Sequence, residues 1–519
     1  MKKNIVKDNS LFMIVLLSFA IYYLYRMFWI APWYDEVYTY LNFIDKGVIY
    51  SATHWPAPNN HVFFSMVSSL LRGFGIYIGL RGVSYLAALG TLIVLYLLFK
   101  KTWGKNFASF GCIIYGSLLA TNSLAVQGRG YSLATFFLIL SIYCGYCICF
   151  EKSGKKIYIL WIISLWLGLY TLVSSVYWVV SICICNGILL LILSKYKELI
   201  KLIIASLIAA LMTLVSYAIL WFSVGAQLIS NDISTGYFGA KISDLIVQFP
   251  RTCLVRGMDF MLSDRSVQGI DRAAFIRDFR FFARDVLSGF WGEKHMAYWY
   301  VLLVSIVILT ILFVALGCYY KKNKQFDKNW LYPLVVSGVG YIMMYIVLLV
   351  QSAYPFARVF SYLGIYLAIS ICVWMDIIRN VFKKLIKKSL PEKANILSSV
   401  VPLILLVMVL FRITTPMYLA EYDYMDYYAY DAIKNIDWSP YESFYATDVY
   451  ANQQIMYHCI EGEEMLLQTD MNYPDVLFVS KNEMNGQWPY YITNEQLAKY
   501  CIEERELLYE NTLYLIYGK

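Results

Sequence analysis

Long apolar runs separated by short polar segments fill the first 415 residues of the chain. A helix needs about 20 apolar residues to cross a bilayer, and eleven runs come near that length or exceed it. The stretch 157–194 fits either one long helix or two short ones. We take it as two, so the predicted spans are residues 11–30, 79–99, 107–126, 131–150, 157–173, 176–194, 199–224, 299–320, 331–351, 359–380 and 396–415. The pattern predicts an all-α polytopic membrane module over residues 1–415, with about eleven transmembrane helices.

The polar segments 31–78 and 225–298 are too long to be simple turns, and residues 416–519 form a third region without a span. In that third region, strand-like runs lie at Ser443–Thr447, Val476–Ser480 and Thr512–Tyr517, and helical patterns lie at Tyr424–Asn435 and Asn494–Cys501. We therefore expect two large loops in the membrane module and a small C-terminal α/β domain.

Composition supports this division. The chain of 519 residues is 60% hydrophobic and only 15% charged, which excludes an ordinary soluble enzyme, a disordered protein and a disulfide-stapled secreted domain. From residue 416 onward there are 18 acidic and 5 basic residues, which leaves 17 acidic and 38 basic residues before it. A basic membrane module with an acidic tail is not typical of nucleic-acid binding, so we expect no nucleic-acid partner.

Basic residues also predict the orientation. Lysines gather in one set of alternate loops, whereas the short loops of the other set carry only Arg129 and Arg358. Positive charge marks cytoplasmic loops. The bias predicts a multi-pass protein of the cell membrane with a cytoplasmic N-terminus. With eleven spans, both large loops and the C-terminal domain would be extracytoplasmic.

The first outer loop holds the most conspicuous acids. Pro32 is placed to open a helix in which Trp33 and Val37 share an apolar face, and Asp35 then turns to water. Glu36 points about 100° away from Asp35 on such a helix. Acids next to a span are often functional. The alternative is that both only stabilise a helix N-terminus, where carboxylates are favoured.

The same loop carries His54, Asn59, Asn60 and His61 before a helix that ends near Arg72. His54, Asn60 and His61 are candidates to contact a ligand. Capping by Asn59 or Asn60 and loop packing are the alternative. The histidines and acids include ligand types for Zn²⁺ or Mn²⁺, but their spacing matches no compact metal motif. We therefore expect no metal and no other cofactor.

An Asp-Glu pair directly after the first span, on a large outer loop with amphipathic helices, resembles the GT-C glycosyltransferases. It is most similar to the protein mannosyltransferase and aminoarabinose transferase group. Residues 127–132 (QGRGYS) resemble that group's Arg-x-Tyr step, and residues 355–362 (PFARVFSY) resemble its late Arg motif. The resemblance implies use of a polyprenyl-phosphate-linked sugar on the non-cytoplasmic side of the membrane.

This resemblance implies roles for individual residues. Asp35 would be the base that takes the proton of the acceptor hydroxyl, and Glu36 would position the loop and the acceptor. Arg129 and Arg358 would bind the donor phosphate, because guanidinium groups bind phosphate oxygens in pairs. Tyr131 would assist them, and His54, Asn60 and His61 would contact the acceptor or the sugar. The alternatives are interfacial arginines and an aromatic belt, and we assign Tyr362 to that belt.

The sequence thus predicts an inverting glycosyltransferase that moves a sugar to an extracytoplasmic glycan, lipid or protein acceptor. Membrane transporters, lipid flippases and polymerases of lipid-linked glycans are the alternatives. Transporters usually show spans broken by Gly or Pro, or charges at the midplane of the bilayer. Most charges here lie at the ends of spans, and the acidic loop comes early in the chain.

Overall fold

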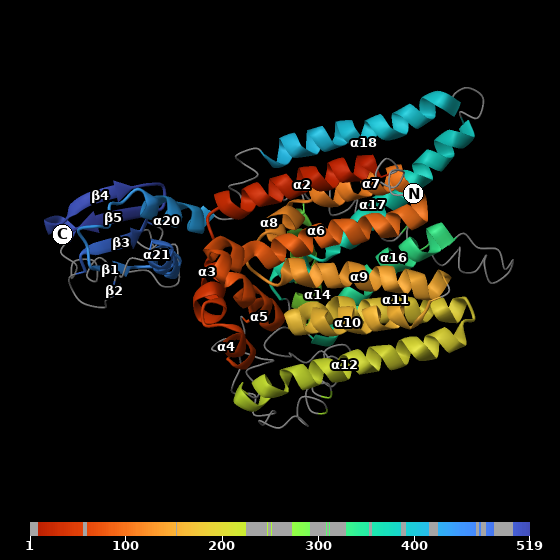
Figure 1. Ribbon diagram of the computed structural model, residues 1–519, viewed down its shortest axis with the longest axis horizontal. Coiled ribbons are helices and arrows are strands. Elements are labelled where there is room, and N and C mark those ends of the chain that lie inside the picture. The colour runs from red at the N-terminus through yellow and green to blue at the C-terminus, as the bar shows by residue number, and fades with distance from the viewer. Residues whose placement is uncertain are drawn as a thin grey trace.

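The computed structural model shows a long bundle of helices with a small sheet-containing domain at one end (Figure 1). The structure describes residues 9–54, 60–151, 153–224, 272–290, 328–351, 355–385, 391–414, 424–462, 467–468, 474–481 and 502–519, with four single residues between them. Within these ranges, six helices are long and apolar enough to cross a membrane, or seven if one bent pair counts as a span. The chain is a multi-pass membrane protein.

Six predicted spans coincide with these helices. They are α2 (Ser10–Trp29), α6 (Ile76–Trp103), α9 (Tyr131–Phe150), α11 (Val176–Ile192) with the preceding turn η3 (Val173–Ser175), α12 (Tyr196–Val224) and α16 (Lys328–Gln351). The predicted span 107–126 is instead two helices, α7 (Lys105–Ser117) and α8 (Leu119–Ala125), bent by 80°. The two helices together are apolar enough to be one broken span, so the predicted span is present with a sharp bend.

The number of eleven spans is not confirmed. Residues 157–194 are two helices, α10 (Lys155–Thr171) and α11, separated by η3. The described apolar parts of α17 (Leu363–Leu385) and α18 (Pro391–Ile413) are shorter than a full span. The predicted span 299–320 lies outside the described residues, apart from two single positions. Most of the loop 225–298 does too, although it contains the helix α14 (Arg272–Ser288).

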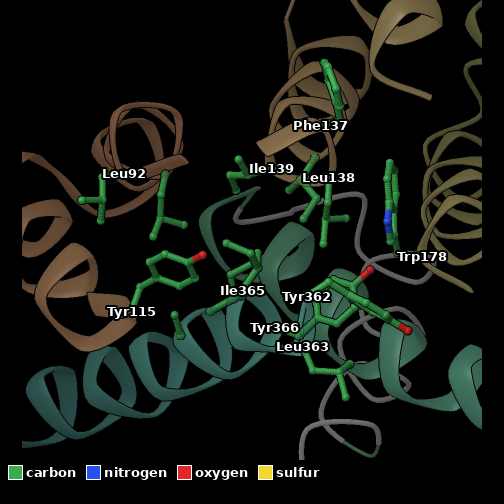
Figure 2. Packing of buried hydrophobic residues seen from close by; sticks show 14 of the residues in the cluster. Leu92, Tyr115, Phe137, Leu138, Ile139, Trp178, Tyr362, Leu363, Ile365 and Tyr366 are labelled. Carbon is green, nitrogen blue, oxygen red and sulfur yellow. The ribbon is translucent and has the colours of Figure 1, made fainter. Parts of the chain in front are cut away.

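The bundle core is built from large aromatic and aliphatic side chains. Figure 2 shows Tyr362 and Tyr366 together with Phe137 and Leu138 of α9 and Trp178 of α11. Glycines allow the helices to approach closely, as is common in membrane bundles. A Cβ on Gly116 would lie 2.2 Å from Phe19 of α2. Tyr362 is only 4% exposed, so its assignment to an interfacial aromatic belt is wrong.

The first outer loop folds into four short elements at one end of the bundle: α3 (Tyr34–Thr39), the π-helical turn η1 (Tyr40–Ile44), α4 (Val48–Thr53) and α5 (Val62–Leu71). The predicted helix ending near Arg72 is α5, followed by the turn η2 (Arg72–Phe74). His61 stands at the N-cap of α5 and makes no side-chain cap there, so the prediction of capping by Asn60 is wrong. Asn59 lies outside the described residues.

The C-terminal region is a five-stranded sheet with helices. Its elements are α20 (Tyr424–Lys434), β1 (Ser443–Ala446), α21 (Val449–Gly462), β2 (Leu467–Gln468), β3 (Val476–Ser480), η8 (Ile502–Glu504), β4 (Glu506–Glu510) and β5 (Tyr514–Gly518). The strand order is β2-β1-β3-β5-β4, in which β1 is parallel to β2 and β3, and β5 is antiparallel to β3 and β4. The predicted α/β character is confirmed. The predicted helix Asn494–Cys501 lies outside the described residues.

The α/β domain packs against the first outer loop through α21 (Figure 1). Gln454 of α21 donates a hydrogen bond to the carbonyl of Pro32, directly before α3. The rings of Tyr34 and Tyr450 lie 5.2 Å apart. The hydroxyls of Tyr77 and Tyr430 are 3.0 Å apart. These contacts fix the segment that carries Asp35 and Glu36 between the domain and the bundle.

Candidate active site

Asp35 lies at the start of α3 and faces two arginines. Its Oδ2 is 2.9 Å from Nη2 of Arg358 and 4.0 Å from Nη2 of Arg129. The three residues are separated by up to 323 positions in the chain, yet the fold brings their charged groups to one point. The predicted base and the two predicted phosphate ligands therefore form one cluster.

The carboxylate of Asp35 does not face water as predicted. Asp35 is 7% exposed and Thr39, on the same side of α3, is fully buried. The polar side of this helix packs against Arg129, which donates to Thr39 Oγ1 at 2.7 Å and to the backbone carbonyl of Asp35 at 3.3 Å. Helical periodicity distinguishes a polar face from an apolar one, but it does not tell whether water or an arginine covers the polar face.

Arg129 sits in a tight turn between α8 and α9. Ser84 of α6 donates to the carbonyls of Gln127 at 2.5 Å and Arg129 at 3.1 Å, and Ser132 donates back to the carbonyl of Ser84 at 3.0 Å. Gly128 is required in this turn because a Cβ would lie 2.5 Å from Leu80. Arg129 itself is 2% exposed. The turn thus holds a buried guanidinium in a fixed position.

His61 joins the cluster beside Arg129. The backbone N–H of Gly130 donates to its Nδ1 at 2.7 Å, so a neutral ring carries its proton on Nε2. That Nε2 lies 3.3 Å from Nη2 of Arg129. Two donors therefore stand side by side, an arrangement that an anionic acceptor would complete. Burial, followed by the charges of Arg129 and Arg358, holds the pKa of His61 well below its ordinary value of 6.5.

Arg358 approaches from the other end of the chain, in the 3₁₀ turn η7 (Ala357–Phe360) before α17. Its Nε donates to the hydroxyl of Tyr131 at 3.2 Å, and its guanidinium carbon lies 4.9 Å from the centre of the Trp33 ring. The Arg358 side chain is 29% exposed, in contrast to the buried Arg129. Arg358 is therefore the member of the cluster that an incoming ligand can reach.

Glu36 makes a separate and closed set of contacts. Arg81 of α6 donates to both carboxylate oxygens at 2.8 Å, and both side chains are 2% exposed. The backbone N–H of Trp33 donates to the carboxylate at 2.8 Å, and that of Gly128 donates as well. Arg81 also donates to the carbonyls of Met27, Ile30 and Ala31 at 2.7–3.0 Å. Glu36 thus connects α2, α3, α6 and the turn that holds Arg129.

The other two residues expected to contact acceptor or sugar lie apart from Asp35. Asn60 is 3% exposed, donates to the carbonyls of Ser51 and His54, and accepts from Ser65 at 2.9 Å. His54 is exposed and stacks on Tyr50 at 3.7 Å. These contacts favour the alternative of loop packing for Asn60. Within the described residues, the ring of His54 contacts Tyr50 and the neighbouring Thr53.

Among the described residues, no three His, Cys, Asp or Glu side chains stand together as a metal site would need. The sequence interpretation missed Arg81, Thr39 and Ser84. A signal existed for Arg81, because a charge inside the apolar run 79–99 needs a buried partner. Nothing in the sequence distinguishes Thr39 or Ser84 from other small polar residues.

The chain is thus a membrane protein in which the carboxylate of Asp35 and the guanidinium groups of Arg129 and Arg358 lie together at one end of a helical bundle. No protein-family model matches the chain, and no curated protein does. Among solved structures, ArnT from Cupriavidus metallidurans bound to undecaprenyl phosphate matches with a TM-score of 0.52 at 9% identity, over 98% of this chain and 97% of that chain. The apo structure of that ArnT gives a TM-score of 0.45 with the same identity and coverage. The match at a TM-score of 0.52 shows that the chain shares the fold of that ArnT, as the resemblance to the aminoarabinose transferase group implied.

Proposed function

We propose that this chain is an inverting glycosyltransferase. It would move a sugar from a polyprenyl-phosphate carrier to a hydroxyl of an extracytoplasmic glycan, lipid or protein. The observation that carries the proposal is the cluster of one carboxylate, Asp35, with two guanidinium groups, Arg129 and Arg358, around a single oxygen. The fold supports the choice of carrier, because a protein of the same fold was solved with undecaprenyl phosphate bound.

The donor phosphate would bind to Arg358, Arg129 and Nε2–H of His61. These groups present donors on one side of Asp35, where negative charge develops as the bond to the sugar breaks. The phosphate would also compete with Asp35 for the guanidinium of Arg358. Binding of the donor would therefore release the carboxylate for its work as a base.

In the chemical step, the acceptor oxygen forms a bond to the anomeric carbon and its proton passes to Asp35. The bond between that carbon and the phosphate oxygen breaks, and polyprenyl phosphate leaves with the electron pair. A phosphate is a good leaving group, so the residues need to hold it but not to protonate it. Attack from the side opposite the phosphate inverts the anomeric centre.

Glu36 would act as a positioning residue in this scheme. Its contacts with Arg81 and the N–H of Gly128 hold α3 against the turn that carries Arg129. The spacing between base and phosphate ligand would therefore depend on Glu36, although Glu36 contacts neither substrate.

The test uses purified full-length protein supplied with polyprenyl-phosphate-linked sugars and measures release of free polyprenyl phosphate by mass spectrometry. We expect release from the wild type and a 10²–10⁴-fold slower release from Asp35→Asn, about the usual contribution of a general base. Asp45→Asn, an exposed acid of the same loop, is the control and should release the carrier at the wild-type rate. Movement of an intact lipid across the bilayer without release would support a flippase instead.

A further inference from the structure

Three successive backbone carbonyls lie in the short connection between α2 and α3. Those of Ile30 and Ala31 accept hydrogen bonds from Arg81 of α6 at 2.7 and 3.0 Å. The third, that of Pro32, accepts a hydrogen bond from Nε2 of Gln454, which lies 422 positions later in the chain, in α21. The connection is therefore held from two sides, by the membrane bundle and by the C-terminal domain.

Gln454 belongs to the side of α21 that contacts the first outer loop. Tyr450 and Tyr457 lie about one helical turn before and after it, so the three side chains share one side of the helix. The ring of Tyr450 lies 5.2 Å from that of Tyr34, and the ring of Tyr457 lies 6.2 Å from that of Tyr40. Gln454 is fully buried between these aromatic contacts. Figure 1 shows α21 beside α3, in agreement with them.

The hydrogen bond from Gln454 acts on the start of α3. Pro32 directly precedes Trp33, the N-cap residue of this helix, and Asp35 follows in its first turn. With six residues, α3 is too short to be stable without contacts to the rest of the protein. Its position therefore depends on the groups that hold its ends, and Gln454 is one of those at the N-terminal end.

A small displacement of α3 would change the surroundings of Asp35. Its Oδ2 lies 2.9 Å from Nη2 of Arg358 and 4.0 Å from Nη2 of Arg129. Both arginines belong to other elements, so a shift of α3 would move the predicted base relative to the predicted phosphate ligands. A misplacement of about 1 Å can slow a reaction about 10²-fold. The transfer rate should therefore be sensitive to whatever holds α3.

We infer that Gln454 is a positioning residue for the transfer reaction. Through its hydrogen bond to Pro32, the C-terminal domain sets the distance between Asp35 and the acceptor hydroxyl. The inference rests on the proposed function and gives the C-terminal domain a part in the reaction. Gln454 touches neither donor nor acceptor in this scheme. Loss of its hydrogen bond should therefore lower kcat and leave binding of the carrier nearly unchanged.

The first test is Gln454→Met, which keeps the length of the side chain and removes the hydrogen-bond donor. It uses purified full-length protein supplied with polyprenyl-phosphate-linked sugars. We expect kcat to fall about tenfold or more, while KM for the donor and affinity for sugar-free polyprenyl phosphate stay within about twofold of the wild type. The matched control is Gln453→Met, at the neighbouring and partly exposed glutamine, which should react like the wild type.

A second variant, Gln454→Glu, makes the hydrogen-bond donor dependent on pH. An ionised carboxylate cannot donate to the carbonyl of Pro32, whereas a protonated carboxyl group can. Burial favours the protonated form, so the ratio of the variant's kcat to that of the wild type should rise as the pH falls from about 8 to about 5.5. The corresponding ratio for Gln454→Met should stay constant. A ratio for Gln454→Glu that stays as low as that for Gln454→Met at every pH would overturn the role of the hydrogen bond.

The outcomes of these tests separate the inference from the proposed function. A wild-type kcat in Gln454→Met overturns the inference, and so does an equal loss of kcat in Gln453→Met. Carrier affinity that falls in parallel with kcat also overturns it, because a general loss of structure would then explain both changes. If the wild type itself releases no polyprenyl phosphate, the proposed function fails.

Discussion

Two neighbouring carboxylates, Asp35 and Glu36, occupy contrasting environments on the same short helix. Glu36 is 2% exposed, and Arg81 and two backbone N–H groups hold both of its oxygens. Asp35 shares one oxygen between two arginines, one of which is 29% exposed. An acid–arginine pair can therefore stabilise the fold or be accessible to a ligand. The difference lies in whether the charged groups of the pair are enclosed by other protein groups, as around Glu36, or are partly exposed, as at Arg358.

Energetics support this distinction. A buried ion pair gains little over apolar packing, but removal of one partner leaves the other charge uncompensated. Arg81 also donates to three backbone carbonyls. The charged groups on the Glu36 side of α3 are therefore hydrogen-bonded within the protein. On the Asp35 side, Arg129 and His61 bring donors together that an anion would satisfy. We therefore propose that a charged ligand binds on the Asp35 side.

The largest effect should follow from removing the charge of Glu36, whose contacts are all inside the protein. Glu36→Gln leaves the buried Arg81 without a counter-charge, which costs about 3–5 kcal/mol of stability. We expect a lower thermal unfolding midpoint in detergent and lower activity because the protein unfolds. In the double variant Glu36→Gln/Arg81→Met, much of the stability should return. An unchanged midpoint in Glu36→Gln would contradict a structural role for this pair.

A smaller effect is expected when Arg358 is replaced by a residue that keeps the positive charge but has no guanidinium group. Arg358→Lys retains the positive charge and loses the planar fork that binds two phosphate oxygens. Hydrogen bonds to charged groups contribute about 1.5–3 kcal/mol, so affinity for polyprenyl phosphate should fall about 10–100-fold. Isothermal titration or a lipid-binding assay measures the change. The control is Arg72→Lys, at an exposed arginine of the first outer loop, which should bind polyprenyl phosphate like the wild type. Wild-type binding by Arg358→Lys would contradict a bidentate contact between Arg358 and the phosphate.

The pH dependence of stability sharpens the account of His61. Its pKa is lowered in the folded state by burial and by Arg129 and Arg358, so below pH 6.5 the unfolded chain binds the extra proton and the folded chain does not. Stability should therefore fall as the pH decreases below 6.5, by up to about 1.4 kcal/mol per pH unit. Thermal midpoints between pH 5 and 7.5 measure this slope. His61→Gln should flatten the slope, and an identical slope in the variant would refute the assignment.

The smallest effect is expected at His54, which is exposed and stacks on Tyr50. His54→Ala should keep transfer within about twofold of the wild type and stability within about 0.5 kcal/mol, as surface substitutions usually do. A tenfold loss of sugar transfer would contradict this expectation and support the prediction that His54 contacts the acceptor or the sugar.

Much of the fold follows from hydropathy, because six of the predicted spans coincide with long apolar helices. Strand-like runs at Ser443–Thr447 and Val476–Ser480 likewise became β1 and β3. The sequence did not reveal the 80° bend after Ser117, since the run 107–126 is apolar throughout. The helix α21 was missed as well, because its residues VYANQQIMYHCIEG show no clean apolar stripe.

The candidate site was partly predictable for a different reason. Asp35, Arg129 and Arg358 are rare charges at the ends of apolar runs, so they stand out singly, and the fold brings them together. Burial of Asp35 was not predictable, because its cover is Arg129, 94 residues away in the chain. The roles of Glu36 and Asn60 as internal connectors likewise depend on long-range partners that no local pattern reveals.

One measurement tests the central claim most directly: binding and transfer by the Asp35→Asn variant on the same preparation. Removal of the negative charge takes away the carboxylate that would compete with an anion for the guanidinium groups of Arg129 and Arg358. We therefore expect polyprenyl phosphate to bind at least as tightly as to the wild type, while sugar transfer falls about 10²–10⁴-fold. Transfer at the wild-type rate would contradict the role of Asp35 as the base, and a parallel loss of carrier binding would contradict the separation of base and phosphate ligands.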